Sequence, residues 1–340
     1  MDTQKLDQTY IANTYARFPV TIVKGKGSLV WDDTGKEYID LSTGIAVDIF
    51  GVADEEWMAA VTKQLGTLQH ISNLYYTEPC VKLAQMLCEK TGMKKVFFGN
   101  SGAEANECAI KAARKWSEEK NGKDYSTIIT LKNSFHGRTI TTLAATGQDV
   151  FHHDFTPLTE GFVYAEPNDL ADLEQLIKAN KCAAVMMEVV QGEGGVMPLD
   201  EAYVKGAAKL CEQYDLLLIC DEVQVGNGRS GKLYGYMHYG VQPDIVSTAK
   251  GLAGGLPLGA TLLGEKVQDV LSAGTHGSTF GGNPVCCAGA INVLSRLDEK
   301  MLEGVEERSA YIKQELAGAK GVLGVSGLGL MLGIQTEKNA

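Results

Sequence analysis

Three short stretches of this chain carry residue types that could do chemistry. The first, residues 100–104, reads N-S-G-A-E and follows the apolar run 96–98. Ser101 and Glu104 have the spacing of a helix capping box, so the simplest interpretation is the start of a helix. A glycine between a strand and a helix also directs free backbone N–H groups and the positive end of the helix dipole at one point, an arrangement that binds phosphate.

The second stretch places Asp221 directly after the apolar run 216–220. The carboxyl end of a buried strand is where open α/β sheets bind ligands. A carboxylate at that position is costly unless a positive group pairs with it. Asp221 therefore either caps a helix or pairs with a nearby arginine such as Arg229, or it holds a cationic group of a ligand, such as a protonated pyridine nitrogen.

The third stretch contains Lys250, which lies between the apolar run 245–248 and the glycine-rich residues 251–255. Most lysines are solvated surface residues, whereas a partly desolvated amine at such a position can form a Schiff base. A phosphate loop, a carboxylate and an amine, each at the end of its own strand, together predict a site for pyridoxal 5′-phosphate (PLP). Lys250 would hold this cofactor, and Asp221 would keep its ring an electron sink.

A glycine-rich stretch offers an alternative from another enzyme class. Residues 226–231 spell G-N-G-R-S-G, which matches the G-x-G-x-x-G pattern of dinucleotide-binding loops. That pattern should turn directly from a strand into a helix. Here residues 221–224 intervene and residues 230–235 have no clear helical pattern, so we interpret the stretch as a loop. The alternative is a nicotinamide-dependent dehydrogenase.

The elements that must position these residues alternate between strand and helix. Nearly continuous apolar runs without a period of two are typical of strands covered on both faces, as in a parallel sheet. Helical patterns separate several of these runs, which predicts an α/β fold with a large, mostly parallel sheet. The predicted strands are 96–98, 127–131, 183–190, 216–220, 245–248 and 260–263, and the predicted helices include 103–119, 169–179 and 201–214.

The two ends of the chain have a different character, and we expect both to join in one smaller α+β domain. Turn residues within 27–40 predict a hairpin. The expected elements at the ends are strands 28–31 and 37–40, one long helix from 284 to about 316, and a glycine-rich strand at 322–335. The predicted division is an N-terminal segment of the small domain (1–50), a large PLP-binding domain (51–284) and an incomplete C-terminal part of the small domain (285–340).

The overall composition argues against several classes of function. Of 340 residues, 44% are hydrophobic and 21% are charged, with a formal net charge of −11. An acidic chain without a basic run is a poor partner for nucleic acid or an anionic membrane. No apolar segment is typical of a secretory signal or long enough to span a membrane. The eight cysteines form no C-x-x-C pair, so we expect reduced thiols, no metal site and a cytoplasmic protein.

Seven ordered stretches resemble the class III aminotransferases, which are PLP enzymes of fold type I. The resemblance runs from about residue 15 to residue 333, and within the family it points to enzymes that act on N-acetylornithine. It implies the fold-type I architecture, with a large domain and a smaller α+β domain. The stretches are S-N-L-Y-Y-T-E-P (72–79), F-G-N-S-G-A-E-A-N-E (98–107), S-F-H-G-R-T (134–139), E-V-V-Q-G-E-G-G (188–195), D-E-V-Q (221–224), K-G (250–251) and H-G-S-T-F-G-G-N-P (276–284).

The resemblance implies a role for each residue around the cofactor. Lys250 would form the Schiff base and later transfer a proton, and Asp221 would pair with the pyridine nitrogen. Gln224 would contact the ring hydroxyl. Phe135 would stack on the ring, although packing in the core is the more common role of a buried aromatic residue. The phosphate would be bound by Ser101, Gly102 and Ala103 and, across the interface of a homodimer, by Thr279.

The resemblance also implies residues for the substrate. Arg138 would bind a carboxylate as a bidentate fork, where the residue alone would suggest a surface arginine. Glu193 would neutralise a substrate-binding arginine when an uncharged or amine-bearing end of a substrate enters. The implied reaction is ping-pong transfer of an ω-amino group from N-acetylornithine to 2-oxoglutarate, in arginine biosynthesis. The other residues expected near the substrate are Glu188, Ser278 and, with packing as the alternative role, Tyr15 and Tyr75.

Two features depart from the family pattern. Residues 51–55, G-V-A-D-E, stand where the family usually has G-H-x-H-P. The chain ends at Ala340, before a stretch that would complete the small domain and carry an arginine for the α-carboxylate, and Ser326 stands where relatives often have arginine. We therefore expect weakened binding of the substrate carboxylate. The alternatives are transfer from another ω-amine (succinylornithine, ornithine, 4-aminobutyrate or a diamine) and a catalytically impaired PLP-binding protein.

Overall fold

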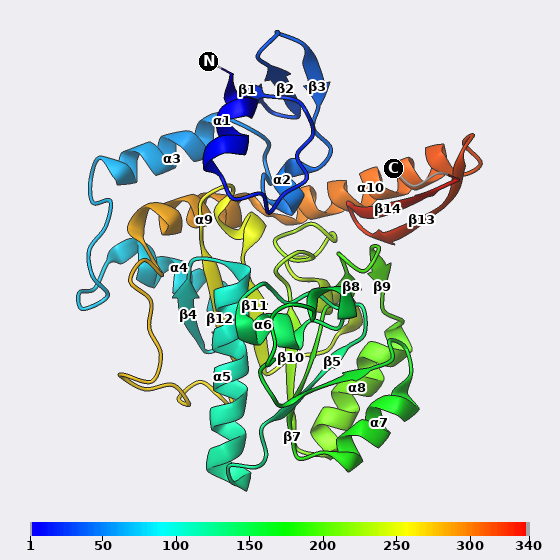
Figure 1. Ribbon diagram of the computed structural model, residues 1–340. Helices are drawn as coiled ribbons and strands as arrows, with labels where there is room; N and C mark the ends of the chain where they lie inside the picture. The colour runs from blue at the N-terminus through cyan, green and yellow to red at the C-terminus, as the bar shows by residue number, and fades with distance from the viewer. Residues whose placement is uncertain (1, 338–340) are drawn as a thin grey trace.

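A seven-stranded sheet forms the centre of the molecule (Figure 1). The structure is a computed structural model that describes residues 2–337. Neighbouring strands are parallel except at β12, which is antiparallel to both of its neighbours, so the predicted mostly parallel α/β sheet is confirmed. In their order across the sheet, the strands are β4 (Lys95–Gly99), β12 (Gly259–Leu263), β11 (Ile245–Thr248), β10 (Leu217–Asp221), β7 (Cys182–Met187), β5 (Thr127–Leu131) and β6 (Phe162–Ala165).

Two apolar cores cover the two faces of this sheet. Along β10, Leu218 and Cys220 belong to one core, and Leu217 and Ile219 belong to the other. Because side chains alternate between faces, a strand covered on both sides reads as a continuous apolar run. Helix α5 packs in the second core, and α4, α7, α8 and α9 pack in the first. Their bounds are α4 (Glu78–Thr91), α5 (Gly102–Asn121), α7 (Leu170–Ala179), α8 (Glu201–Gln213) and α9 (Pro284–Arg296).

The N-terminal part forms a small antiparallel sheet that lies at the top of Figure 1. Its hairpin β2–β3 lies within one residue of the predicted strands at each end, which confirms that prediction. A bidentate ion pair fastens this part to α9, because Arg296 donates from Nη1 and Nη2 to Asp54 at 2.6 and 3.1 Å. The elements are α1 (Thr3–Tyr10), β1 (Ile22–Lys26), β2 (Leu29–Asp32), β3 (Glu37–Ile39), α2 (Thr43–Ala46) and α3 (Glu55–Leu65).

The C-terminal part differs from the prediction in two places. The expected single helix from 284 to about 316 is wrong, because Leu297 and Asp298 separate α9 from α10 (Glu299–Leu316), and Asp298 caps α10 by accepting from the N–H of Met301 at 2.8 Å. The single glycine-rich strand is also wrong. Residues 322–336 form a hairpin of β13 (Val322–Leu328) and β14 (Met331–Thr336), in which Gly329 takes a left-handed φ of 56° at the turn.

Smaller differences concern single strands and the domain division. Strand β6 was not predicted, and the strand expected at 183–190 ends at Met187. The N-terminal and C-terminal sheets are separate, and the division at 50 and 284 stays a prediction. The remaining short elements are α6 (Ile140–Ala145), β8 (Val190–Gln191), β9 (Met197–Pro198) and the 3₁₀ helices η1 (Asp149–Phe151), η2 (Gly235–Tyr239) and η3 (Lys250–Ala253).

Across residues 2–337, no helix is both long enough and apolar enough to cross a bilayer. The same residues contain no cluster of three or more histidine, cysteine or acidic side chains placed to hold a metal ion. All eight cysteines are free thiols, and six of them are buried.

A buried carboxylate ties η2 to the end of the central strand β10. Glu222 is fully buried, and its carboxylate accepts from the backbone N–H groups of Gly235 at 2.7 Å and Tyr236 at 2.9 Å. Burial disfavours the charged form and raises the pKa of Glu222 to about 7, although both N–H groups work against this shift.

This shift predicts a pH dependence of folding stability. Between the ordinary pKa of 4.5 and about 7, the native state keeps a proton on Glu222 that the unfolded chain has lost. The contribution of Glu222 to the free energy of unfolding therefore falls as pH rises through this window, by on the order of 3 kcal/mol in total, and is constant above it. Urea unfolding over this pH range should show a shallower fall for Glu222→Gln than for the natural protein.

The matched control is Glu118→Gln, which changes an exposed carboxylate on α5. Its pH dependence should coincide with that of the natural protein. Parallel curves for the natural protein and Glu222→Gln would show that Glu222 keeps an ordinary pKa in the native state.

Candidate active site

The three predicted stretches meet at one cavity of about 500 Å³. The cavity lies at the carboxyl ends of β4, β10 and β11. These three strands run in the same direction, because β12 is antiparallel to both β4 and β11, so their carboxyl ends lie at the same edge of the sheet. Its walls come from the start of α5, the loop before α6, the end of β10 and the start of η3. The lining residues are Tyr15, Ser101, Gly102, Ala103, Asn106, Phe135, His136, Gly137, Arg138, Glu188, Asp221, Val223, Gln224 and Lys250.

The first wall is the N-terminus of α5, and small residues let the chain approach closely there. Ser101 caps the helix, because its Oγ accepts from the N–H of Glu104 at 3.2 Å. The reciprocal bond of a capping box is absent, since the Glu104 carboxylate accepts instead from the backbone and side chain of Asn100. A Cβ on Gly102 would lie 2.6 Å from Val223, and one on Gly259 would lie 2.2 Å from the carbonyl oxygen of Ser101. Larger residues at these two positions would displace the turn at the start of α5.

Asp221 lies in the opposite wall and is only 3% exposed. Its Oδ2 lies 2.7 Å from both Nδ2 of Asn106 and Nδ1 of His136, and its Oδ1 accepts from the N–H of Val223 at 3.0 Å. The pairing with Arg229 considered from the sequence is wrong, because that guanidinium donates instead to Thr43 at 3.3 Å. Asp221 thus keeps a buried carboxylate toward the cavity, and no arginine or lysine among residues 2–337 is in contact with it.

His136 is locked in place behind Asp221. Its N–H donates to Oγ1 of Thr146 at 2.9 Å, and its carbonyl oxygen accepts from Asn106 at 2.7 Å. Burial alone would lower the pKa of His136, but the hydrogen bond and the negative charge of Asp221 outweigh burial and raise it. A protonated His136 would donate from Nδ1 to the carboxylate and stabilise its negative charge.

Lys250 reaches the cavity from a strained backbone position. Its φ is 47°, in the left-handed region that residues other than glycine rarely occupy. The preceding residues are held by buried Asn227, whose Nδ2 donates to the carbonyl oxygen of Ala249 at 3.0 Å and to Oγ1 of Thr248 at 3.1 Å. Burial lowers the pKa of Lys250, although nearby acids oppose the shift. A lysine amine with a lowered pKa is a better nucleophile and base near neutral pH.

The mouth of the cavity combines an arginine, aromatic rings and acids. The guanidinium of Arg138 lies 4.2 Å from the ring centroid of Phe151 and 5.5 Å from that of Phe135. The N–H of Phe135 donates to Oε2 of Glu188 at 2.9 Å, and burial raises the pKa of this carboxyl. Exposed Glu193 accepts from Gln224 at 3.4 Å. The exposed position of Arg138 and its place in the lining suit recognition of an anionic group of a ligand.

Some predicted residues lie outside the lining of this cavity. Ser278 accepts from Asn100 at 3.1 Å and from the N–H of Gly281 at 2.9 Å, so it holds a neighbouring loop. Thr279 is exposed beside it, and Tyr75 is exposed on the loop before α4. Glu193 also lies outside the lining and contacts Gln224, which is part of it.

Sequence reasoning missed the roles of Asn106, His136 and Val223 around Asp221. The sequence held a signal that could have drawn attention to two of them. Asn106 is a polar residue among several alanines in its predicted helix, and His136 follows Phe135 in one of the stretches that resemble the family. Their contacts with Asp221 join residues 115 and 85 positions apart. Patterns within a few neighbouring residues do not show contacts between residues so far apart in the sequence.

The residues of this cavity fit pyridoxal 5′-phosphate. A buried carboxylate that no arginine or lysine of residues 2–337 contacts suits a protonated ring nitrogen, a helix start with a close-packed glycine suits a phosphate, and a desolvated lysine suits a bond to an aldehyde. The volume is also within the range of cofactor sites.

The comparisons with known proteins agree with this geometry. The family described as "Aminotransferase class-III" matches residues 10–340. The acetylornithine aminotransferase of Haemophilus ducreyi is 51% identical over 99% of this chain and 86% of its own length, and the succinylornithine transaminase of Citrobacter koseri is 45% identical over 95% and 80%. The crystal structure of the ornithine aminotransferase from Toxoplasma gondii superposes with a TM-score of 0.94 at 35% identity, over 99% of this chain and 82% of that one. The chain therefore belongs to the class III aminotransferases, which are PLP-dependent transaminases.

Proposed function

We propose that this chain transfers the ω-amino group of N-acetylornithine to 2-oxoglutarate, which gives N-acetylglutamate semialdehyde and glutamate in arginine biosynthesis. The observation that carries the proposal is the 51% identity, over 99% of the chain, with an acetylornithine aminotransferase. The cavity supports it with an amine, a buried carboxylate and an arginine on its walls. We also propose a cytoplasmic location, which the free thiols favour.

The cofactor would be held on every side by residues that line the cavity. Bound PLP supplies an electron sink for the carbon that carries the amino group. Lys250 would hold it covalently, Asp221 would pair with its ring nitrogen, and Gln224 would contact the ring hydroxyl. Phe135 would cover one face of the ring. The phosphate would be bound by the backbone and side chains at the start of α5, namely Ser101, Gly102 and Ala103.

Two residues would divide the proton chemistry. The Nζ of Lys250, once free, would take the proton that leaves the amine-bearing carbon of the donor, a task that its lowered pKa favours. Asp221 would hold the proton on the ring nitrogen in place, because His136, Asn106 and the Val223 N–H keep its carboxylate fixed. These three act as positioning groups, since each acts through Asp221.

The substrates would be recognised at the mouth of the cavity. Arg138 would bind the α-carboxylate of N-acetylornithine and then a carboxylate of 2-oxoglutarate as a bidentate fork. The rings of Phe151 and Phe135 beside it restrict where its guanidinium can lie. Tyr15, which lines the cavity but is 69% exposed, would bound the entrance. Glu188 and Glu193 would complete the acidic side of the site, and Ser278 would support it from the neighbouring loop.

The expected outcome of a donor panel follows from this proposal. With 2-oxoglutarate as acceptor and glutamate formation as the readout, kcat/KM should be highest for N-acetylornithine. Succinylornithine, ornithine, 4-aminobutyrate and a diamine should follow, because the relatives that match this chain include transaminases named for acylated and free ornithine. Lys250→Ala should form glutamate from none of them.

The panel also separates the alternatives. A higher kcat/KM with another ω-amine would assign the chain to that donor. The absence of glutamate with every donor, in a protein that binds PLP, would identify a catalytically impaired PLP-binding protein. Lys300→Ala, which removes an exposed amine on α10, is the control and should keep the full rate.

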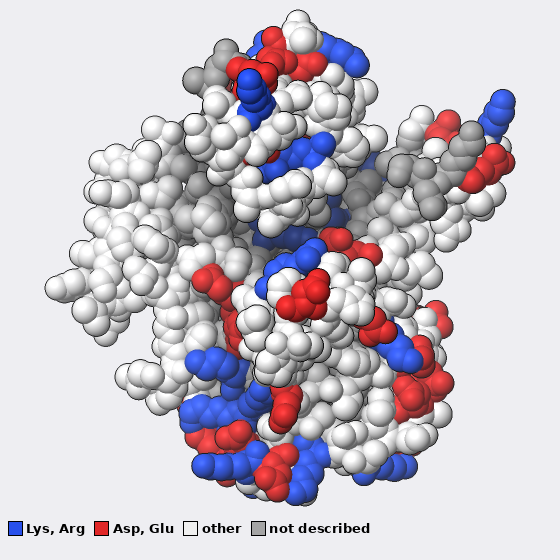
Figure 2. Space-filling view, in the orientation of Figure 1, with Lys and Arg blue, Asp and Glu red and all other residues white. Residues whose placement is uncertain are grey.

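We propose in addition that the working unit is a homodimer. Leu74 and Tyr76 on the loop before α4 are 87% and 98% exposed, and Phe280 is 60% exposed. The two loops are in contact, because Asn73 donates to the carbonyl oxygens of Ser278 and Gly281. On the left of the molecule, where the loop before α4 lies, Figure 2 shows few charged side chains. Exposed apolar patches of this kind mark interaction surfaces, and Thr279 beside Phe280 would reach the phosphate of a second subunit.

The dimer predicts a specific effect of charge at this surface. Leu74→Asp together with Tyr76→Asp should convert the dimer into monomers in analytical ultracentrifugation, because two carboxylates would be buried without partners. Leu323→Asp, at an exposed position on β13, should leave the dimer intact. A natural protein that sediments as a monomer at micromolar concentration would refute the proposal.

A further inference from the structure

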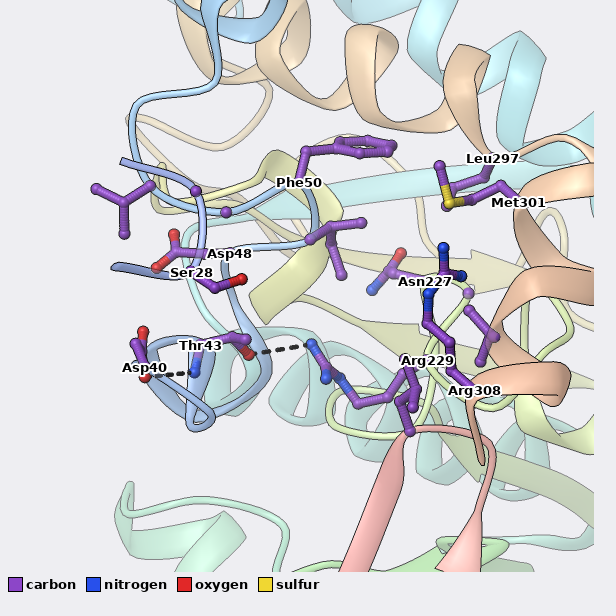
Figure 3. A pocket seen from close by; sticks show the side chains of 17 residues that line it. Ser28, Asp40, Thr43, Asp48, Phe50, Asn227, Arg229, Leu297, Met301 and Arg308 are labelled. Carbon is purple, nitrogen blue, oxygen red and sulfur yellow. Dashed lines mark hydrogen bonds between the residues drawn. The ribbon is translucent and has the colours of Figure 1, made fainter. Parts of the chain in front are cut away.

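A second cavity of about 370 Å³ lies where the N-terminal part meets α10 and the turn of the β13–β14 hairpin (Figure 3). It shares no lining residue with the substrate cavity. Its walls come from residues 27–28 and 40–52, from the loop 227–229, and from the side of α10. The proposed aminotransferase chemistry gives this cavity no role.

One side of the cavity carries two guanidinium groups without an acidic partner. Arg229 is mostly removed from water, its Nη2 donates only to the hydroxyl of Thr43 at 3.3 Å, and its buried Nε has no hydrogen-bond partner. Arg308 lines the same cavity, and its Nη1 donates to the carbonyl oxygen of Gly304 at 2.7 Å. Within residues 2–337, neither arginine forms an ion pair. Arg308 is exposed to solvent, whereas the charge of Arg229, which is partly withdrawn from water, is costly unless an opposite charge compensates it.

The other side of the cavity carries two carboxylates. Asp48 is half-buried, and in the described part of the chain its carboxylate accepts no hydrogen bond and forms no ion pair. Asp40 accepts from Ser42 and Thr43 through Oδ1 alone, which leaves its Oδ2 unused. Burial, followed by the negative charge of Asp40, raises the pKa of Asp48, which is the effect expected of a carboxylate that lacks a cationic partner.

Apolar side chains make up much of the remaining lining of the cavity. Ile49, Phe50, Leu297, Met301 and Val305 line it. In Figure 3 the labelled carboxylates of Asp40 and Asp48 lie on the left of the cavity, and the guanidinium groups of Arg229 and Arg308 lie toward its centre and right. A ligand that pairs with both the acids and the arginines and also packs on the apolar side chains must therefore carry a positive group, an aliphatic body and a carboxylate.

We propose that this cavity is a binding site for a small aliphatic amino acid in its zwitterionic form. The carboxylate would lie between Arg229 and Arg308, and the ammonium group would face Asp48 and Asp40. Guanidinium groups bind carboxylates as planar forks, and both arginines have donors left for such a bond. A dicarboxylate is a poor occupant, because the two acidic side chains would repel its second charge.

The cavity lies next to the segment that carries Lys250. Asn227, which lines the cavity, is the residue that donates to Thr248 and Ala249. Ile49 also lines it, and a Cβ on Gly251 would lie 2.6 Å from the Cδ1 of Ile49. A bound amino acid would therefore contact Asn227 and Ile49, which touch the residues on either side of Lys250.

L-Proline is a suitable probe, because it is an aliphatic zwitterion whose secondary amine cannot enter the amino-transfer reaction. Isothermal titration calorimetry of the PLP-loaded protein should show one proline site per chain. Arg308→Gln and Asp48→Asn should each weaken proline binding by about tenfold or more, because each removes one charge that the ligand would neutralise. Pyrrolidine, which lacks the carboxylate, and cyclopentanecarboxylate, which lacks the amine, should bind at least tenfold more weakly than proline.

Three control variants make the result specific to this cavity. Lys300→Gln on α10 and Asp33→Asn in the β2–β3 turn change exposed charges outside the cavity and should leave proline binding unchanged. Arg138→Gln changes the substrate cavity and should also leave it unchanged. The absence of proline binding by the natural protein, equal binding by Arg308→Gln and Asp48→Asn, or loss of binding in Arg138→Gln would each overturn the proposal. Retained amino transfer in Arg308→Gln and Asp48→Asn would show that both variants fold.

Discussion

The candidate active site depends on one buried negative charge, the carboxylate of Asp221 at the end of β10. A carboxylate that is 3% exposed is tolerated only where donors surround it. Here those donors are Nδ2 of Asn106 on α5, the imidazole of His136 and the N–H of Val223. Because they come from separate segments, satisfying Asp221 brings the start of α5, the loop before α6 and the end of β10 together. These segments are also the walls of the cavity.

The sheet supplies the second constraint, which is the common direction of its strands. Strands β4, β10 and β11 end at the same edge, so the residues that follow them converge although 100 or more positions separate the first from the others. Close packing then fixes their distances, since Gly102 and Gly259 leave no room for a side chain between neighbouring segments. Asn227 holds the residues before Lys250, whose left-handed backbone turns the amine toward the cavity.

Much of the fold could be predicted from local patterns, because those patterns have a direct physical cause. The apolar runs that became β10 and β11 are continuous since both faces of the sheet are covered, and Ser101 marked the start of α5 through its capping geometry. The break between α9 and α10 could not be predicted in this way. Leu297 continues the apolar pattern, and only the capping residue Asp298 marks the interruption. The hairpin after residue 321 was mistaken for one strand because glycines occur throughout it.

The prediction of the site had a different limit. The residue types and their places after strands were sufficient to nominate Lys250, Asp221 and the turn at Ser101, which line one cavity. The hydrogen-bond partners of Asp221 could not be predicted from the sequence. A histidine or an asparagine next to apolar residues has many possible roles until its tertiary contacts are known. The same holds for the second cavity, whose charges come from segments more than 170 residues apart. The roles of the individual residues in binding the cofactor and substrate stay predictions.

The covalent attachment point of the cofactor tests the central claim most directly. Reduction of the PLP-loaded protein with borohydride should bleach its visible absorbance band and fix a phosphopyridoxyl group on Lys250, identified by mass spectrometry of proteolytic peptides. An unreduced protein should give the same peptide without the added mass. A phosphopyridoxyl group on another lysine, or a protein with no band to bleach after incubation with PLP, would contradict the assignment of this cavity as the catalytic site.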